Sequence, residues 1–259
     1  MVDTHSHLND QLFLTMDLEE VVNRAKINGV ETIICNGGGI NSSKRALEIA
    51  HRFNNVYATV GIHPEEAEEL KKLGVEEVKQ QLLDLAQNEK VVGIGEAGLD
   101  FFTNISEEQK QFQKVIFRIN TWLGDKTGLP LVVHNRNADA EILELLKDFK
   151  QGVQLHCFVG REPFLNEVVN RKYFISFGGI LTFKKSGYLR EIAKMVPEDK
   201  LLIETDSPYL SPEPIRQNIN EPANVKIVAK ALAEIKGLSE QEVDRLTSAN
   251  AVKLFQRLI

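Results

Sequence analysis

The feature that most constrains the fold of this chain is a repeated alternation of short apolar, β-branched runs with longer stretches of helical periodicity. Such alternation predicts βα units around a parallel sheet. Parallel strands covered on both faces should be nearly continuous in apolar residues, as the runs at 131–133 and 201–203 are. Eight runs of this kind predict strands in the segment before His5 and at 31–35, 56–60, 91–95, 131–134, 153–156, 173–177 and 201–204.

The stretches between these runs carry the helical pattern. We predict helices at 18–28, 43–53, 65–88, 107–124, 138–149, 163–171, 188–196 and 221–235. Eight alternating pairs predict a closed (β/α)8 barrel of the TIM type, and an open doubly wound sheet is the alternative. An additional C-terminal helix over 239–258 begins with Ser239 and Glu242 in the spacing of a capping box. We expect this helix to pack outside the barrel.

Length and composition predict one domain over residues 1–259, because no low-complexity linker or break in composition divides the chain. No apolar run approaches the roughly 18 residues that cross a bilayer. The first residues lack the basic and apolar parts of a signal peptide. We therefore expect a cytoplasmic monomer, and the sequence indicates neither a membrane nor a stable protein partner.

Cysteine content indicates the state of the thiols, and net charge argues against one class of nucleic-acid-binding protein. The two cysteines, Cys35 and Cys157, each fall in an apolar run and are predicted to be reduced, buried thiols. The formal charge of −6 argues against a protein that holds nucleic acid mainly by neutralising many phosphates. A phosphate substrate would need local cations, which bound metal ions can supply.

Histidines gather at the predicted strand ends. Of the six in the chain, only His51 falls inside a predicted helix, where we interpret it as a partly exposed residue. Because the strand ends form the active-site face of such a barrel, residues distant in sequence converge there. Glu96 follows the fourth strand and Asp206 the eighth. The histidines at strand ends are His5, His7, His63, His134 and His156.

Imidazoles and carboxylates together are the ligands of zinc, manganese and magnesium ions. His5 and His7 are two residues apart on a strand, so both point to one face and can share an ion. We expect Glu96 to bridge that ion to a second one. The predicted ligands of the two divalent ions (Mg, Mn or Zn) are His5, His7, Glu96, His134, His156 and Asp206.

Catalysis in this scheme depends on a water whose pKa the ions lower. Asp206 would orient that water and accept its proton, whereas the alternative is a turn cap within Asp206-Ser207-Pro208. Arg136 could pair with a substrate phosphate or with a neighbouring carboxylate. His63 could donate to the substrate or simply close the third strand. The run at 93–98 matches G-x-G-x-x-G, but no helix opens there, which excludes a dinucleotide site.

Six motifs in order along the chain resemble the TatD family of metal-dependent deoxyribonucleases, within the amidohydrolase-like barrel enzymes. They are Asp3-Thr4-His5-Ser6-His7-Leu8, Gly61-Ile62-His63-Pro64, Gly95-Glu96-Ala97-Gly98-Leu99-Asp100, Leu129-Pro130-Leu131-Val132-Val133-His134-Asn135-Arg136, His156-Cys157-Phe158 and Glu204-Thr205-Asp206-Ser207-Pro208-Tyr209-Leu210. The resemblance implies a TIM-like barrel, a divalent-metal centre on the six ligands and hydrolysis of phosphodiester bonds in DNA, typically from the 3′ end. It also implies that His63 and Arg136 face the substrate.

The chain departs from the family pattern at two positions. Ile219 stands where the family usually has a basic residue before Asn-Glu-Pro, and Val159 replaces a frequent serine. Both departures concern contacts with nucleic acid and leave the ligand set intact. The change at Ile219 favours the main rival function, an amide, ester or lactone hydrolase, including D-aminoacyl-tRNA deacylase-like activity. A non-catalytic barrel that only binds metal is a third interpretation.

Overall fold

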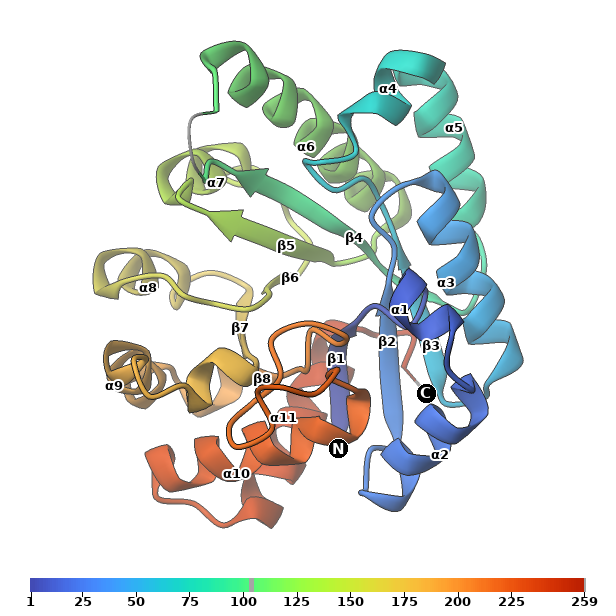
Figure 1. Cartoon of the computed structure of the whole chain (residues 1–259). Coiled ribbons are helices and arrows are strands. Elements are labelled where there is room, and N and C mark those ends of the chain that lie inside the picture. The colour runs from blue at the N-terminus through green and yellow to red at the C-terminus, as the bar shows by residue number, and fades with distance from the viewer. Residues whose placement is uncertain (103–104, 259) are drawn as a thin grey trace.

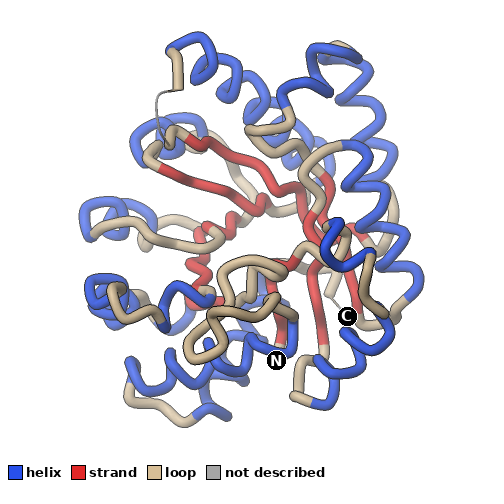
Figure 2. The backbone as a smooth tube through the Cα atoms, in the orientation of Figure 1, coloured by secondary structure: helices blue, strands red, loops and turns tan. Residues whose placement is uncertain are grey.

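The centre of the molecule is a parallel sheet of eight strands in sequence order (Figures 1 and 2). We describe it from a computed structural model that covers residues 1–102 and 105–258. The strands are β1 (Val2–Ser6), β2 (Thr32–Asn36), β3 (Val56–Val60), β4 (Val91–Asp100), β5 (Leu131–Arg136), β6 (Val153–Leu155), β7 (Tyr173–Phe177) and β8 (Leu201–Ile203). All eight predicted strands are therefore present.

The sheet closes on itself between β1 and the segment after β8. Ser6 and Ser207 form a parallel bridge. The backbone N–H of Asp206 donates to the His5 carbonyl at 2.9 Å, and that of His7 donates to Ser207 at 2.7 Å. The prediction of a (β/α)8 barrel is thus confirmed, and the open-sheet alternative is wrong. Closure also brings the two ends of the predicted ligand set, at β1 and after β8, into contact.

Helices surround the barrel wall (Figure 1). Within the described residues, no helix combines the length and the apolar character needed to cross a membrane. The helices are α1 (Gln11–Leu14), α2 (Leu18–Ile27), α3 (Ile40–Arg52), α4 (Ala67–Leu73), α5 (Val75–Ala86), α6 (Glu107–Thr127), α7 (Asp139–Leu145), α8 (Glu162–Val168), α9 (Gly187–Met195), α10 (Val225–Lys236) and α11 (Glu240–Leu254), with 3-10 turns η1 (Gly179–Thr182), η2 (Glu198–Lys200) and η3 (Pro222–Asn224).

Several predicted boundaries differ from the observed ones by one to four residues, and two larger differences have a clear physical cause. The single helix expected over 65–88 is divided at Gly74, whose φ of 84° ends α4 because a right-handed helix cannot pass through that conformation. Strand β4 continues five residues beyond its predicted end at Gly95, to Asp100. Gly98 permits this extension: its φ is +152°, and a Cβ atom there would collide with the His134 carbonyl on β5.

The inside of the barrel has its own apolar cluster, separate from the larger core between wall and helices. Phe255, just after α11, is fully buried in it. We expected the C-terminal helix to pack outside the barrel, but its end covers the floor at the amino ends of the strands. The cluster joins Val2, Ile34, Val92, Val132, Phe174 and Leu202 from the strands to Ala251, Leu254, Phe255 and Leu258. Local periodicity identifies such a helix but cannot say which surface it covers.

A layer of buried polar side chains lies inside the barrel between this floor and the active-site end. Gln154 donates to Thr4 Oγ1 and to Glu204 Oε2, at 3.0 Å each. Thr4 in turn donates to the Ile203 carbonyl at 2.9 Å. Because each of these groups is buried and hydrogen-bonded, the layer fixes the strand ends that carry the site.

Candidate metal centre

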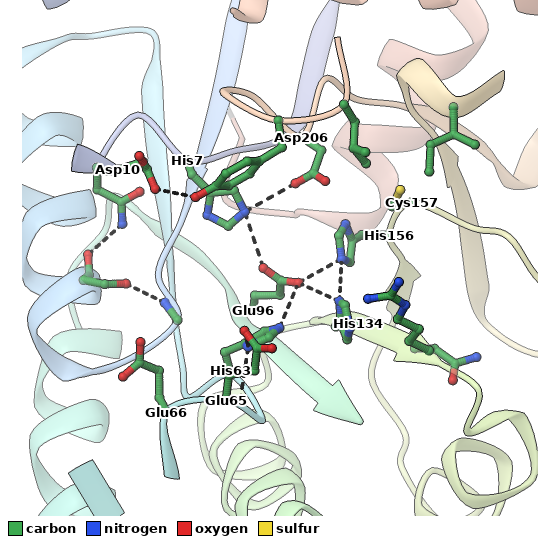
Figure 3. A pocket seen from close by; sticks show the side chains of 18 of the residues that line it. His7, Asp10, His63, Glu65, Glu66, Glu96, His134, His156, Cys157 and Asp206 are labelled. Atoms are coloured by element: carbon green, nitrogen blue, oxygen red, sulfur yellow. Dashed lines mark hydrogen bonds and ion pairs between the residues drawn. The ribbon is translucent and has the colours of Figure 1, made fainter. Parts of the chain in front are cut away.

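The predicted ligands meet at the carboxyl ends of the strands, and all except the fully buried His5 line a cavity of about 1070 Å³ (Figure 3). They come from the ends of β1, β4 and β5 and from the segments after β6 and β8. His63, after β3, joins them. Three overlapping groups have donor atoms within 4.8 Å of one another: His5 with His7 and Asp206, His5 with Glu96 and His156, and His63 with Glu96 and His134.

One group of donors gathers around His5 of β1 and His7, which directly follows this strand. The Nε2 atoms of His5 and His7 are 3.1 Å apart, so both rings point at one place. Asp206 Oδ1 lies 3.4 Å from His7 Nε2 and 3.7 Å from His5 Nε2. Glu96 Oε2 lies 3.4 Å from His5 Nε2 and 3.5 Å from His7 Nε2. Four donors thus surround a single small volume.

The second group of donors gathers around the other oxygen of Glu96. Glu96 Oε1 lies 2.8 Å from His156 Nε2 and 3.1 Å from His134 Nδ1. His63 Nε2 is farther away, at 3.6 Å. Glu96 therefore presents one carboxylate oxygen to each group, which is the arrangement that a carboxylate spanning two cations requires. Its backbone N–H donates to the Gly37 carbonyl, which holds this part of β4 against the end of β2.

Electrostatics keep the central carboxylate ionised. Burial alone would raise the pKa of Glu96, but the neighbouring His156, His63 and His5 hold it well below its usual value. Burial also opposes ionisation of Asp206, and its hydrogen bond with His7 lowers its pKa. Both side chains are therefore lone-pair donors at neutral pH, as metal binding requires.

The histidines differ in their response to the same surroundings. Burial lowers the pKa of His63 to about 4, so this ring is neutral near pH 7. For His156, burial would lower the pKa, but the charges of Glu96 and Glu204 raise it well above the usual value. The centre thus carries surplus negative charge that either protons or metal cations can neutralise, and the donor set fits cations.

Two carboxylates behind the histidines had no role assigned from the sequence. Asp100 Oδ2 lies 3.0 Å from His134 Nε2, and Glu204 Oε1 lies 3.3 Å from His156 Nδ1. Glu204 is fully buried and also accepts from the Cys157 N–H at 2.6 Å. Strand alternation could have identified Asp100, because it shares a face of β4 with Glu96, four residues earlier.

The remaining predicted residues lie at the edge of the cavity. The Arg136 guanidinium stacks on the Phe102 ring, 3.4 Å from its centroid, and its Nη1 is 3.9 Å from Asp100 Oδ2. It therefore contacts a carboxylate and lines the cavity as well. Cys35 is buried as expected, which raises its pKa to about 12. Cys157 instead follows β6 at the cavity wall and is partly exposed.

Comparison with known proteins identifies the family of this chain. The family model described as TatD related DNase matches residues 2–256. This chain belongs to the TatD family. Its sequence is 38% identical to the metal-dependent hydrolase YabD of Bacillus subtilis, over 99% of each chain. It is 32% identical to the 3′-5′ ssDNA/RNA exonuclease TatD of Citrobacter koseri, over 98% of each.

A solved structure supports the same assignment. The TatD homologue YjjV of Escherichia coli superposes with a TM-score of 0.91 at 28% identity, covering 99% of this chain and 98% of that one. The TatD family members matched here are named as metal-dependent hydrolases or nucleases. The chain is accordingly a TatD-family metal-dependent hydrolase with the TIM-barrel fold.

Proposed function

We propose that this TatD-family chain is an exonuclease that hydrolyses phosphodiester bonds from the 3′ end of DNA, with a pair of divalent ions as cofactor. The Citrobacter koseri relative, alike over 98% of its length, is named as a 3′-5′ ssDNA/RNA exonuclease. The structural observation that carries the proposal is the position of Glu96, with one oxygen in each of two donor groups. Nucleases with paired ions use such a clamp on in-line displacement at phosphorus.

The donor chemistry of the site fits Mg²⁺, Mn²⁺ or Zn²⁺. When bound, the ions would polarise the phosphodiester and lower the pKa of a water towards neutrality. Availability decides among these metals, because the same ligands suit all of them. The proposed ligands are His5, His7 and Asp206 for one ion, His134 and His156 for the other, and Glu96 for both, in keeping with the distances from each Glu96 oxygen.

Side chains around the donors supply the remaining chemistry. Asp206 is ionised and faces the first donor group, so we assign its carboxylate to orient the attacking water and accept its proton. The neutral ring of His63 can donate a hydrogen bond to a substrate oxygen. Arg136, whose side chain is 47% exposed, can pair with a phosphate as it enters the cavity.

A degradation assay tests the proposal. Purified protein with Mg²⁺, Mn²⁺ or Zn²⁺ should shorten 5′-labelled single-stranded DNA stepwise. Asp206→Asn should lower kcat roughly 100- to 10,000-fold while the circular dichroism spectrum stays that of the folded protein. Asp84→Asn, on α5 away from the cavity, is the matched control. Intact DNA with all three metals, whether single-stranded, recessed or duplex, would contradict the proposal, and so would full activity in the Asp206 variant.

The amide or ester hydrolase remains a weaker alternative. Among the solved structures, an N-acetyl-D-glucosamine-6-phosphate deacetylase of Mycobacterium smegmatis is similar at only 11% sequence identity. A likeness at this level shows a shared fold and carries no argument about the reaction. The replacement at Ile219, which favoured this rival, lies outside the set of residues that line the cavity. Neither the deacetylase structure nor the residue at position 219 is stronger support than the 32% identity to a relative named as an exonuclease.

A further inference from the structure

Two tyrosine rings line the same cavity as the donor groups and are strongly exposed within it. Tyr209 is 47% exposed and Tyr188 is 51% exposed. Neither ring takes part in the chemistry proposed above. Large aromatic side chains usually bury most of their surface, so two half-exposed rings in one cavity indicate an apolar surface available to a ligand.

Both rings are fixed at their hydroxyl ends. The Tyr209 hydroxyl donates to Asp10 Oδ2 at 2.6 Å, and Asp10 also caps α1 through its other carboxylate oxygen. The Tyr188 hydroxyl donates to the Val159 carbonyl at 3.3 Å. Each ring is therefore held in place before any ligand arrives, which reduces the entropy lost when a flat group stacks on it.

The two rings are connected to different halves of the metal centre, Tyr209 by direct contact and Tyr188 through Val159. The Tyr209 ring stands edge-on to the His7 ring, with centroids 6.1 Å apart, and so borders the first donor group. Tyr188 is tied to Val159, three residues after His156 of the second donor group. Two exposed aliphatic side chains also line the cavity: Leu12, two residues after Asp10, and Val159, which is 36% exposed.

Charge indicates what kind of ligand these surfaces take. The chain has a formal charge of −6. Among the described residues, the cavity wall has two arginines, Arg45 and Arg136, and five acidic residues, which are the donors Glu96 and Asp206 together with Asp10, Glu65 and Glu66. Apart from the phosphate held by the proposed ions, such a cavity neutralises few phosphates, so further contacts to the backbone of a polynucleotide supply little affinity. Aromatic rings supply binding affinity by stacking instead, because unpaired nucleobases stack on them irrespective of sequence.

We propose that Tyr209 and Tyr188 form a base-stacking subsite on either side of the metal centre, which selects unpaired polynucleotide strands by their bases. The inference rests on the proposed nuclease function and deepens it. In a duplex the faces of the bases are already covered by their neighbours, whereas the frayed or single-stranded end exposes them. A strand whose scissile phosphate lies at the ions would place a base over each ring.

The first test compares two oligonucleotides of deoxythymidine, one intact and one with abasic residues at its last two 3′ positions. The readout is the ratio of kcat/KM for the two with Mn²⁺, which we expect to favour the intact strand roughly 5- to 150-fold per stacked base. Tyr209→Ala and Tyr188→Ala should each move this ratio towards one. Tyr209→Phe and Tyr188→Phe keep the rings and should keep the ratio.

The phenylalanine variants separate stacking from a structural role of the hydroxyls. If Tyr209→Phe lowers the ratio as far as Tyr209→Ala does, the ring acts only through Asp10 and the inference is wrong. Met195→Ala is the matched control for Tyr188, because Met195 is an exposed residue of the same helix outside the cavity wall. An unchanged ratio in both alanine variants also overturns the inference.

A binding measurement keeps this inference distinct from the nuclease proposal. Fluorescence anisotropy with dye-labelled intact and abasic oligonucleotides is measured on Asp206→Asn, alone and combined with each tyrosine variant. Base-dependent binding that disappears with the rings supports stacking even if the wild-type protein cleaves no DNA. Cleavage without any base dependence in binding or turnover supports the nuclease and overturns the stacking subsite.

Discussion

Asp100 Oδ2 lies 3.0 Å from Nε2 of His134, on the opposite edge of the ring from the Nδ1 atom that faces Glu96. This carboxylate fixes the ring orientation and raises the basicity of the donor nitrogen. Burial would raise the pKa of Asp100, but the hydrogen bond with His134 lowers it, so the group is an anion at neutral pH.

We therefore expect Asp100→Asn to weaken metal binding at the second donor group roughly 10- to 100-fold. Titration calorimetry with Mn²⁺ measures the effect, which should appear in one of two binding steps. Asp84→Asn, on the exposed face of α5, serves as the control. Equal affinities in both variants and the wild type would show that Asp100 does not support His134.

Metal binding should also raise thermal stability, because the ligands are assembled only in the folded state. In wild-type protein, Mn²⁺ should increase Tm and a chelator should reverse the increase. Glu96→Gln should remove most of the increase, since Glu96 faces both donor groups.

The same measurement tests the substrate contact predicted for His63 against a further role, that of metal ligand, which its grouping with Glu96 and His134 suggests. If His63 contacts substrate, His63→Ala should keep the metal-dependent increase in Tm while lowering turnover. Loss of the increase in this variant would make His63 a ligand, as its distance of 3.6 Å from Glu96 Oε1 permits.

Gly98→Ala should destabilise the protein and disturb the second donor group together. The new Cβ would strike the His134 carbonyl, and φ of +152° is a conformation that only glycine adopts without strain. We expect a loss of about 2–4 kcal/mol in the free energy of unfolding, measured by urea denaturation. Gly187→Ala is the control, since a Cβ there meets only the end of the Arg190 side chain at 3.9 Å.

Phe255→Ala should cost about 3–5 kcal/mol in the free energy of unfolding, as expected for a fully buried aromatic ring that leaves a cavity behind. Val252→Ala, at a residue of α11 that is 51% exposed, should change stability by less than about 0.5 kcal/mol. A small loss in the Phe255 variant would mean that the floor of the barrel tolerates a void.

Much of the fold was predictable because its signals are local. Buried parallel strands are continuous apolar runs, and the capping box of Ser239 with Glu242 is present at the start of α11 as predicted. The convergence of donors also followed from sequence, because His5 and Asp206 each stand where a strand ends.

What escaped prediction depends on contacts between distant segments. Strand β4 runs on to Asp100 because β5 pairs with it there, with Gly98 opposite His134. Glu204 could not be assigned to His156 from spacing, because β7 separates β6 from β8 in the sheet and only the tertiary fold brings the two side chains together. The position of Phe255 under the barrel likewise follows from tertiary packing rather than from the periodicity of its helix.

The interior of the barrel is ordered by depth, with apolar side chains at the floor, buried hydrogen-bonded groups above them and ionisable donors at the mouth. Resistance to unfolding and chemical reactivity therefore reside at opposite ends of the same strands. Substitutions in the loops beyond Leu210 or Val159 can alter which molecules reach the donors without loosening the packing beneath. Such a scaffold can acquire new substrates while its lower half stays unchanged.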